Sequence, residues 1–319
     1  MNSLLAQAHE PGGFEVFVDN LARTPLSKVV VFVGVCTVLR LALMPYLYRA
    51  AQHRRGGLFT AGRILNELLD AIVYAGIVVF LVIRPFAIQA FRIPSGSMLD
   101  TLLINDFIVA NKAIYRYSRP SHGDIVVFRP PVRACTAEQI DTDGQPKVDF
   151  IKRCIGLPGD RIEIRGGTLY RNGKPLQEPY RKGAHSFDWK LVEYKGGYEP
   201  WKGSWIPVIT NFNGQANYAV DGIAKDYAIG RALDGPGEGG VPWVRAWKSQ
   251  LELTDEERIL SQELAAAPAA PIPPGHYLML GDNREGSFDG RGWGLVPERD
   301  LIGRSEFIWL PLNRWRVTR

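Results

Sequence analysis

Two serines share a short polar stretch in which a hydroxyl group could act as a nucleophile. Residues 92–102 read RIPSGSMLDTL, and Pro94 and Gly96 in this stretch predict a tight, exposed turn. Such a turn can hold the hydroxyl of Ser95 or Ser97 clear of the backbone and present amide N–H groups beside it. Most SGS sequences are ordinary turns, so the stretch alone does not establish a nucleophile.

Lys152 is the candidate base that could activate such a serine. It lies in residues 149–160, DFIKRCIGLPGD, which begin as a strand, so Phe150, Lys152 and Cys154 share one face. Apolar neighbours withdraw the ammonium group from water and lower its pKa, and the neutral amine can then accept a proton near neutral pH. The alternative is a strand lysine whose side chain extends to water.

A third stretch, residues 281–294, reads GDNREGSFDGRGWG and predicts a rigid, hydrogen-bonded loop. Ser287 in this loop could exchange a hydrogen bond with a neighbouring amine. Asp289 and Arg291, two residues apart, could form a structural ion pair. The alternative is an ordinary surface loop.

Histidine is the usual partner of a catalytic serine, but none of the five lies in a motif-like setting. A Ser-His-Asp triad is not excluded, although nothing in the sequence supports one, and a serine paired with a lysine is a recognised variant. The histidines are His9, His53, His122, His185 and His276.

The three cysteines give no metal signature, because no Cys/His spacing typical of zinc occurs. Cys36 lies in an apolar run. Cys135 and Cys154 could form a disulfide in an exported domain, but two separate buried thiols are the favoured interpretation. We expect neither a metal nor a cofactor.

Two apolar segments precede these stretches, and each is long enough to cross a bilayer, which takes about 20 residues. The first covers residues 29–47 and is broken only by Arg40, and the second covers residues 71–91, with Arg84 near its far end. Arginine near the end of a span can reach the interface. The sequence therefore predicts two transmembrane helices joined by a loop at 48–70, in preference to a cleaved signal peptide.

The charges between the two segments predict their orientation. Residues 49–63 carry four arginines and no acidic residue, whereas residues 1–28 carry three acidic residues. The positive-inside rule places loop 49–63 in the cytoplasm. Both termini, including an exported segment at 1–28, and everything beyond about residue 91 then lie outside.

The exported part predicts a mostly β fold. Short β-rich runs at 124–128, 161–164 and 307–310 are separated by Gly and Pro turns, and Asn172-Gly173 is a strong hairpin signal. We expect an antiparallel β-sheet catalytic domain formed by residues 92–183 and 273–319.

Residues 184–272 predict an inserted β subdomain and a linker. Residues 184–250 are rich in Trp, Tyr and Gly, a helix capped by Thr254 is expected at 255–267, and the linker leads to a strand at 276–280.

The net charge of +5 and the pI of about 9.1 would suit a nucleic acid or an anionic membrane surface. Lys and Arg are scattered, however, and no nucleic-acid recognition motif occurs. We therefore expect no nucleic-acid partner.

These stretches, in this order and behind two apolar segments, resemble the bacterial type I signal peptidases (leader peptidases), which are serine proteases with a Ser-Lys dyad. The similarity does not extend to residues 184–250. It runs through residues 91–102, 123–128, 149–160, 273–294 and 294–309.

The resemblance implies a role for each matching residue. Ser97 matches the nucleophile and Lys152 the general base, while the Ser95 hydroxyl and the Ser97 backbone N–H match the oxyanion hole. Ser287 matches the serine that positions the base, and Asp289 and Arg291 match a structural pair near the site. The residues that would line the substrate pockets are Phe91, Ile93, Pro94, Met98, Leu102, Ile108, Val127, Phe150 and Ile151.

The sequence departs from the common family pattern at three positions. Asp100 stands where proline is usual, Gly290 where serine is usual, and Phe150 where tyrosine is frequent. None of these changes removes a catalytic group. Asp100 places a carboxylate near the cleft, where it could shift the preference for side chains beyond the cleaved bond.

The resemblance implies a membrane-bound serine endopeptidase that removes signal peptides after A-x-A sites. Its partners would be exported preproteins and lipid of the bacterial inner membrane, and we expect a monomer. Two alternatives are a Ser-Lys protease similar to the self-cleaving repressors and a membrane-anchored β domain that binds exported proteins. The discriminating observation is whether the Ser97 hydroxyl and the Lys152 amine lie within hydrogen-bond reach.

Overall fold

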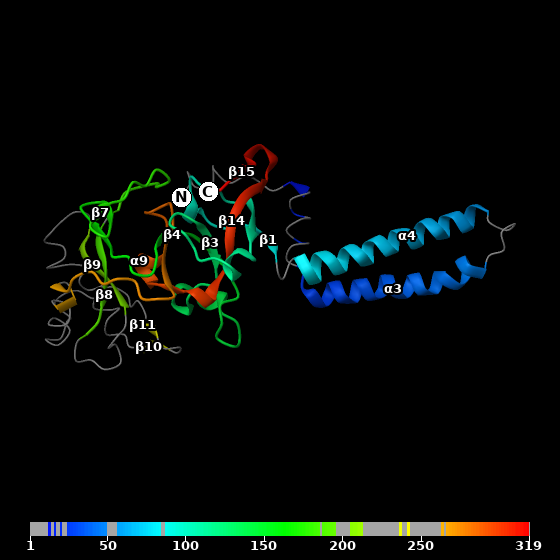
Figure 1. Cartoon of the computed structure of the whole chain (residues 1–319), viewed down its shortest axis with the longest axis horizontal. Helices are drawn as coiled ribbons and strands as arrows, with labels where there is room; N and C mark the ends of the chain where they lie inside the picture. Colours follow the sequence, from blue (N-terminus) through cyan, green and yellow to red (C-terminus); the bar gives the residue numbers. More distant parts are fainter. Residues whose placement is uncertain are drawn as a thin grey trace.

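A long helical hairpin projects from a β-rich body in the computed structural model of the chain (Figure 1). The structure describes residues 24–49, 56–83, 87–185, 187–195, 205–212 and 266–318, together with the short pieces 12–13, 16, 20, 236–237, 241–242 and 263–264. The helix expected at 255–267, with its Thr254 cap, lies largely outside the described residues.

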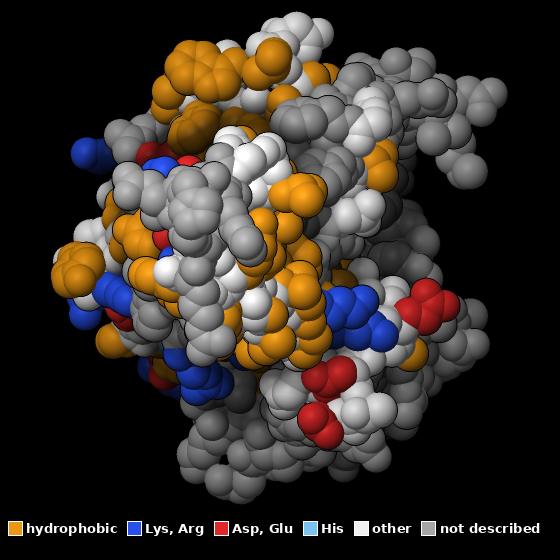
Figure 2. All heavy atoms as spheres, turned by 90° about the vertical axis from the view of Figure 1, so that its right-hand side faces the viewer, with side chains coloured by type: hydrophobic (Ala, Val, Ile, Leu, Met, Phe, Trp, Pro, Cys, Tyr) orange, Lys and Arg blue, Asp and Glu red, His pale blue; other side chains and the backbone are white. Residues whose placement is uncertain are grey.

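The hairpin pairs helix α3 (Leu26–Arg49) with helix α4 (Gly57–Ile77), which continues as the π-helix η2 (Val78–Ile83). Most apolar side chains of α3 point away from the protein, and Figure 2, which faces the hairpin side of the molecule, shows that apolar side chains predominate there. Arg40 of α3 forms an ion pair with Asp70 of α4. The arginine that interrupts the first apolar segment therefore meets a carboxylate inside the hairpin.

Residues 26–48 of α3 form the one helix among the described residues that is long and apolar enough to cross a membrane, and an 18-residue stretch of it has a mean hydropathy of 2.1. The predicted bounds of the second span, 71–91, are wrong. Its helix starts at Gly57, within the predicted loop 48–70, and ends at Ile83, whereas residues 88–91 belong to strand β1. An apolar run is compatible with a buried strand as well as a helix, and the acidic residues Glu67 and Asp70 lower the hydropathy of the helix's first half.

The body is built on an antiparallel sheet, as the sequence predicts, and this sheet has eight strands. The order is β1-β2-β14-β3-β4-β12-β13, with β15 paired to β14. The strands are β1 (Ile88–Arg92), β2 (Phe107–Asn111), β3 (Ile125–Phe128), β4 (Phe150–Gly156), β12 (His276–Leu280), β13 (Val296–Pro297), β14 (Leu301–Leu310) and β15 (Arg316–Val317).

A second antiparallel sheet, with the order β7-β6-β5-β8-β9, is inserted between β4 and β12. Its strands are β5 (Ile162–Arg165), β6 (Thr168–Arg171), β7 (Lys174–Pro175), β8 (Phe187–Glu193) and β9 (Trp205–Phe212), and β10 (Pro236–Gly237) pairs with β11 (Val241–Pro242) separately. Asn172 and Gly173 both have positive φ angles, 55° and 78°, and form the predicted hairpin turn between β6 and β7.

The predicted boundary of the insert at residue 184 is too late. Strands β5, β6 and β7 precede residue 184 but belong to the second sheet, because Ile164 of β5 pairs with Trp189 of β8. Periodicity identifies these strands without telling which sheet they join.

Short helical turns connect the strands. They are the 3-10 helices η3 (Gly96–Met98), η4 (Ile114–Arg116), η5 (Val132–Ala134), η6 (Ala137–Gln139), η9 (Glu298–Asp300) and η10 (Leu312–Arg314), and the α-helical turn α9 (Gly290–Trp293).

The two faces of the main sheet bury different apolar clusters, because alternate side chains of a strand point to opposite faces. Val127 and Ile151 belong to one cluster, which we call the groove cluster, with the buried residues Ile93, Met98, Leu102, Ile108, Ala110, Ile125 and Ile308. Val126, Phe128 and Cys154 belong to the cluster on the other face. A third cluster joins the two sheets, since Ile155 and Leu278 pack there with Trp189.

All three cysteines are free and buried, so Cys135 and Cys154 do not form a disulfide. Burial raises the pKa of both thiols. The interpretation of two separate buried residues is the one that the structure supports.

Candidate active site

The two candidate serines lie in the turn that follows β1. Ser95 has an extended backbone and precedes η3, on which Ser97 lies. Asn283 holds this turn from the loop after β12: its backbone N–H donates to Ser97 O over 3.1 Å, and its Nδ2 donates to Gly96 O over 3.0 Å. The turn is therefore fixed by a segment that lies more than 180 residues later in the chain.

Lys152 reaches this turn from β4. Its Nζ atom lies 2.8 Å from Ser97 Oγ and 3.1 Å from Ile151 O. The residue is only 5% exposed, and the Phe150 ring centroid is 5.4 Å from Nζ. The nucleophile and base candidates thus form a hydrogen-bonded pair in which the amine is buried and the serine is half-buried. This pair is the observation that distinguishes a Ser-Lys enzyme from a binding domain.

Burial lowers the pKa of Lys152 to about 8, although the carboxylates of Asp289 and Asp282 oppose the shift by stabilising the ammonium form. A lysine with this pKa has a substantial neutral fraction near neutral pH and can take the proton of a serine hydroxyl. The expected apolar surroundings of Lys152 are therefore present.

Ser95 lies beside the nucleophile candidate, with its Oγ 3.4 Å from Ser97 Oγ. The residue is exposed, so its hydroxyl can turn toward a substrate oxygen. The Ser95 hydroxyl and the Ser97 backbone N–H are the two donors that the sequence assigns to an oxyanion hole.

Ser287 is a half-buried residue of the loop after β12, and its buried Oγ makes no hydrogen bond with any described residue. It lies next to the nucleophile turn, because a methyl group added to Gly281 would lie 2.2 Å from Ser287 Oγ and 2.6 Å from Ser97 O. Gly281 is what lets the two serines approach. The structure brings Ser287 near the pair without a hydrogen bond to Lys152.

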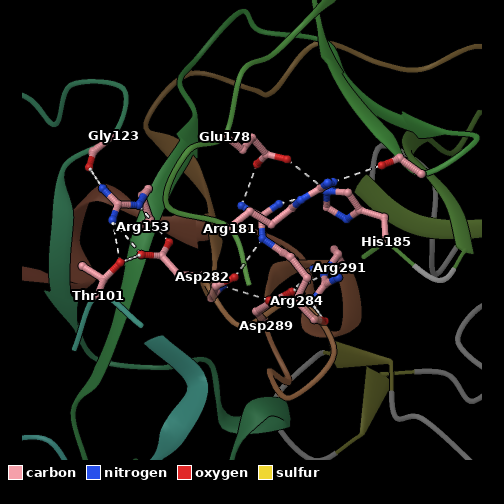
Figure 3. Close-up of polar contacts among 12 residues, drawn as sticks. Thr101, Gly123, Arg153, Glu178, Arg181, His185, Asp282, Arg284, Asp289 and Arg291 are labelled. Atoms are coloured by element: carbon pink, nitrogen blue, oxygen red, sulfur yellow. Dashed lines mark hydrogen bonds and ion pairs between the residues drawn. The ribbon is translucent and has the colours of Figure 1, made fainter. Parts of the chain in front are cut away.

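Asp289 and Arg291 form the expected ion pair, with two contacts of 2.9 Å between the carboxylate and the guanidinium. Asp289 also accepts the Gly281 N–H over 2.9 Å, and Arg291 donates to Arg284 O over 2.7 Å (Figure 3). Burial alone would raise the pKa of Asp289, but Arg291 and the hydrogen bonds outweigh it and lower the pKa. The pair therefore braces the loop that carries Ser287.

A second buried ion pair, which the sequence did not reveal, lies on the other side of Lys152. Asp282 accepts from Arg153 Nε over 2.8 Å and from Arg153 Nη2 over 2.6 Å (Figure 3). Thr101 Oγ1 donates to the same carboxylate over 2.6 Å. The only sequence signal was the charge of Asp282 beside Gly281. The pair ties β4, which carries the base, to the nucleophile turn.

Six of the nine predicted pocket residues belong to the groove cluster, and Phe91 packs against it. Phe150 lies instead in the cluster on the opposite face, because it is one residue out of phase with Ile151. Pro94 is exposed in the turn and belongs to neither cluster. The cluster contains three buried members that were not predicted, Ala110, Ile125 and Ile308.

The polar contacts of the described histidines are with residues other than Ser95 and Ser97. His122 pairs with Asp160 at 2.6 Å, His185 contacts Glu178 and Arg284, and His276 contacts Pro274 O. Among the described residues, no group of three or more His, Cys, Asp or Glu side chains is arranged to hold a metal ion.

Comparison with known proteins relates the chain to one family. A family model described as "Signal peptidase, peptidase S26" matches residues 65–310. The signal peptidase I of Haemophilus influenzae is 28% identical over 281 residues, which cover 78% of this chain and 70% of that protein. The corresponding protein of Pseudomonas aeruginosa is 29% identical over 255 residues (73% and 68%), and that of Leptolyngbya laminosa is 27% identical over 251 residues (78% and 83%).

Proposed function

We propose that this chain, which belongs to the signal peptidase family (peptidase S26) and is therefore a serine endopeptidase, cleaves signal peptides from exported preproteins after small residues, with Ser97 as nucleophile and Lys152 as general base. The observation that carries the proposal is the distance of 2.8 Å between the buried Lys152 Nζ and the half-buried Ser97 Oγ.

The chemistry follows from that pair. Neutral Lys152 takes the proton of Ser97 while Ser97 Oγ attacks the scissile carbonyl carbon. The negative charge that develops on the carbonyl oxygen is stabilised by the Ser97 N–H and the Ser95 hydroxyl. The Lys152 ammonium then protonates the leaving amine, and a water molecule, deprotonated by Lys152, hydrolyses the acyl-enzyme.

The sheet offers a place for an extended substrate. Among the described strands, β1 pairs only with β2, and residues 150–152 of β4 pair only with β3. Free strand edges can pair with a peptide backbone, leaving alternate side chains to enter pockets. The residues of the groove cluster next to Ser97, such as Met98, are apolar, and apolar surroundings favour a small apolar side chain such as that of alanine.

The hairpin supports a membrane anchor made of α3 and of α4 with η2. Ser97 follows the end of η2 at residue 83 by only 14 residues, so the site lies close to the membrane surface. An embedded signal peptide would present its cleavage site at that level. The positive-inside rule favours a cytoplasmic loop 49–63 and an exported catalytic domain.

The test of the activity uses two matched precursors that differ at the residue before the scissile bond, alanine in one and phenylalanine in the other. The purified chain should cleave the first, with the new N-terminus verified by sequencing, and leave the second intact. Equal cleavage of both would contradict the small-residue pocket. If neither precursor is cleaved, the proposed activity is contradicted.

Orientation is tested by adding protease to spheroplasts. The part beyond residue 91 should be digested while loop 49–63 is spared. A protected C-terminal part would reverse the proposed topology.

A further inference from the structure

The nucleophile turn has two sides with different chemistry. Met98 and Leu102 point into the groove cluster. Asp100 and Thr101 face the opposite side, where Thr101 bonds to Asp282 and the Asp100 carboxylate lies 2.8 Å from Lys182 Nζ. An apolar surface and a charged surface thus flank the same serine.

Lys182 belongs to a segment that we call the strap, residues 178–185, between β7 and β8. Its backbone N–H donates to Asp282 O over 2.8 Å, and its carbonyl accepts from Arg284 N over 2.9 Å. The residue between these two contacts, Asn283, donates to Ser97 O. Residues 282–284 therefore lie as one layer between the strap and the nucleophile turn.

The strap is held in place by a buried cluster. Arg284 forms an ion pair of 2.7 Å with Glu178, and its Nη1 lies 3.0 Å from His185 Nε2 (Figure 3). Burial alone would raise the pKa of Glu178, but His185 and Arg284 lower it, so the cluster keeps its charge pair. Tyr180 covers the Arg153 guanidinium, with 3.9 Å between guanidinium carbon and ring centroid. The position of Lys182 is consequently fixed by its neighbours on both sides.

We propose that the Asp100–Lys182 pair sets the charge preference for substrate residues just beyond the scissile bond. This inference rests on the proposed function. In the proposed binding mode, substrate residues before the bond lie against the groove cluster, so the residues after it leave the serine over residues 282–284 and the strap. There the two side chains are partly exposed, 67% for Asp100 and 35% for Lys182, and their opposite charges cancel.

Removing either charge exposes the other to the substrate. The field of Asp100 alone attracts a cationic residue, and that of Lys182 alone attracts an anionic one. Arg316, which donates to the carbonyls of Asp100 and Thr101, adds a constant positive charge in every variant. Unit charges about 8–10 Å apart at an exposed, screened site change kcat/KM roughly two- to threefold for each charged precursor. The changes are opposite for Glu and Lys, so the ratio of the two changes by roughly three- to tenfold.

The experiment compares three precursors with the same A-x-A site and with Glu, Gln or Lys as the second mature residue. The full chain and its variants Lys182→Met, Asp100→Asn and the double substitution are assayed on each. The measured quantity is the ratio of kcat/KM for the Glu precursor to that for the Lys precursor. Lys182→Met should lower this ratio about three- to tenfold, Asp100→Asn should raise it by a similar factor, and the double variant should return to within about twofold of the wild type.

When the assay is repeated in about 0.5 M NaCl, the shifts of the Glu/Lys ratio in both single variants should become smaller, because salt screens exposed charges. The matched control is Arg165→Met, which breaks an exposed ion pair with Glu163 in the second sheet and should leave the ratio unchanged. If one of the two single variants does not fold, the other still tests the proposal, because it should shift the Glu/Lys ratio of kcat/KM in the opposite direction.

A wild-type chain that cleaves none of the precursors would refute the proposed function and this inference with it. Cleavage of all three with an identical ratio in every variant would refute the role of the pair alone. Shifts of the same sign in both single variants would also refute it, since opposite charges require opposite signs.

Discussion

The pH dependence of cleavage gives the most direct test of Lys152. Only the neutral amine can accept the proton of Ser97, and burial lowers the pKa of Lys152 to about 8. Because the group is active above its pKa, kcat/KM should rise with pH and level off above about pH 8.5, as long as the substrate does not titrate in this range.

The size of the effect follows from that value. With a pKa of about 8, the neutral fraction is about 1% at pH 6, about 9% at pH 7 and about half at pH 8, so kcat/KM should rise roughly 50-fold between pH 6 and pH 8. A lysine with the ordinary value would be only about 0.03% neutral at pH 7, so burial raises the competent fraction roughly 300-fold.

The assay measures kcat/KM for a short peptide with an A-x-A site, without titratable side chains, from pH 5.5 to pH 9.5. Lys152→Arg serves as control and should be inactive throughout, since the guanidinium stays charged. A profile with its midpoint near pH 6.5, or substantial turnover by Lys152→Arg, would show that another group is the base.

Further substitutions separate the roles of neighbouring residues. Ser97→Ala should reduce cleavage to background while the fold persists, whereas Ser95→Ala should lose about 10²- to 10³-fold in kcat with little change in KM; the reverse order of effects would exchange the two roles. Gly281→Ala should lower kcat by at least about 100-fold, because its methyl group would lie 2.6 Å from the carbonyl oxygen of Ser97. Wild-type turnover by this variant would contradict the close approach of Gly281 to Ser97. Arg153→Met breaks a buried ion pair and should lower the free energy of unfolding by about 3–5 kcal/mol, measured by denaturation against the exposed control Arg165→Met; equal stability of the two variants would refute the assignment.

The sequence predicted the residues of the site better than the bounds of the elements that carry them. Ser97 and Lys152 lie in short motifs with strong local constraints, a Pro/Gly turn and a strand, and the structure brings them within 2.8 Å. Their catalytic roles stay predictions until activity is measured. Phe150 packs on the sheet face opposite Ile151, as strand alternation requires, but its ring centroid lies 5.4 Å from Lys152 Nζ, so its place in a substrate pocket stays a prediction.

The errors share a physical cause: local composition does not determine which strand or helix a segment pairs with or packs against. The apolar run 71–91 is continuous in sequence, but its last residues pair with β2 while its first residues pack on α3. The strap around Lys182 has no sequence signature at all, since its position depends on backbone hydrogen bonds to residues about 100 positions later. Nothing local distinguishes such a segment from an ordinary loop.

The place of β14 in the main sheet has a consequence for the biosynthesis of the protein. This strand, residues 301–310, lies between β2 and β3, so in the hydrogen-bonded order of the main sheet it connects the half that ends in the nucleophile turn with the half that carries the base. Pairing between strands that lie far apart in the sequence forms late, so the main sheet is complete only after residues 301–310 have been made. A chain that has not yet reached this strand therefore lacks the completed sheet that holds Ser97 and Lys152 within 2.8 Å of each other.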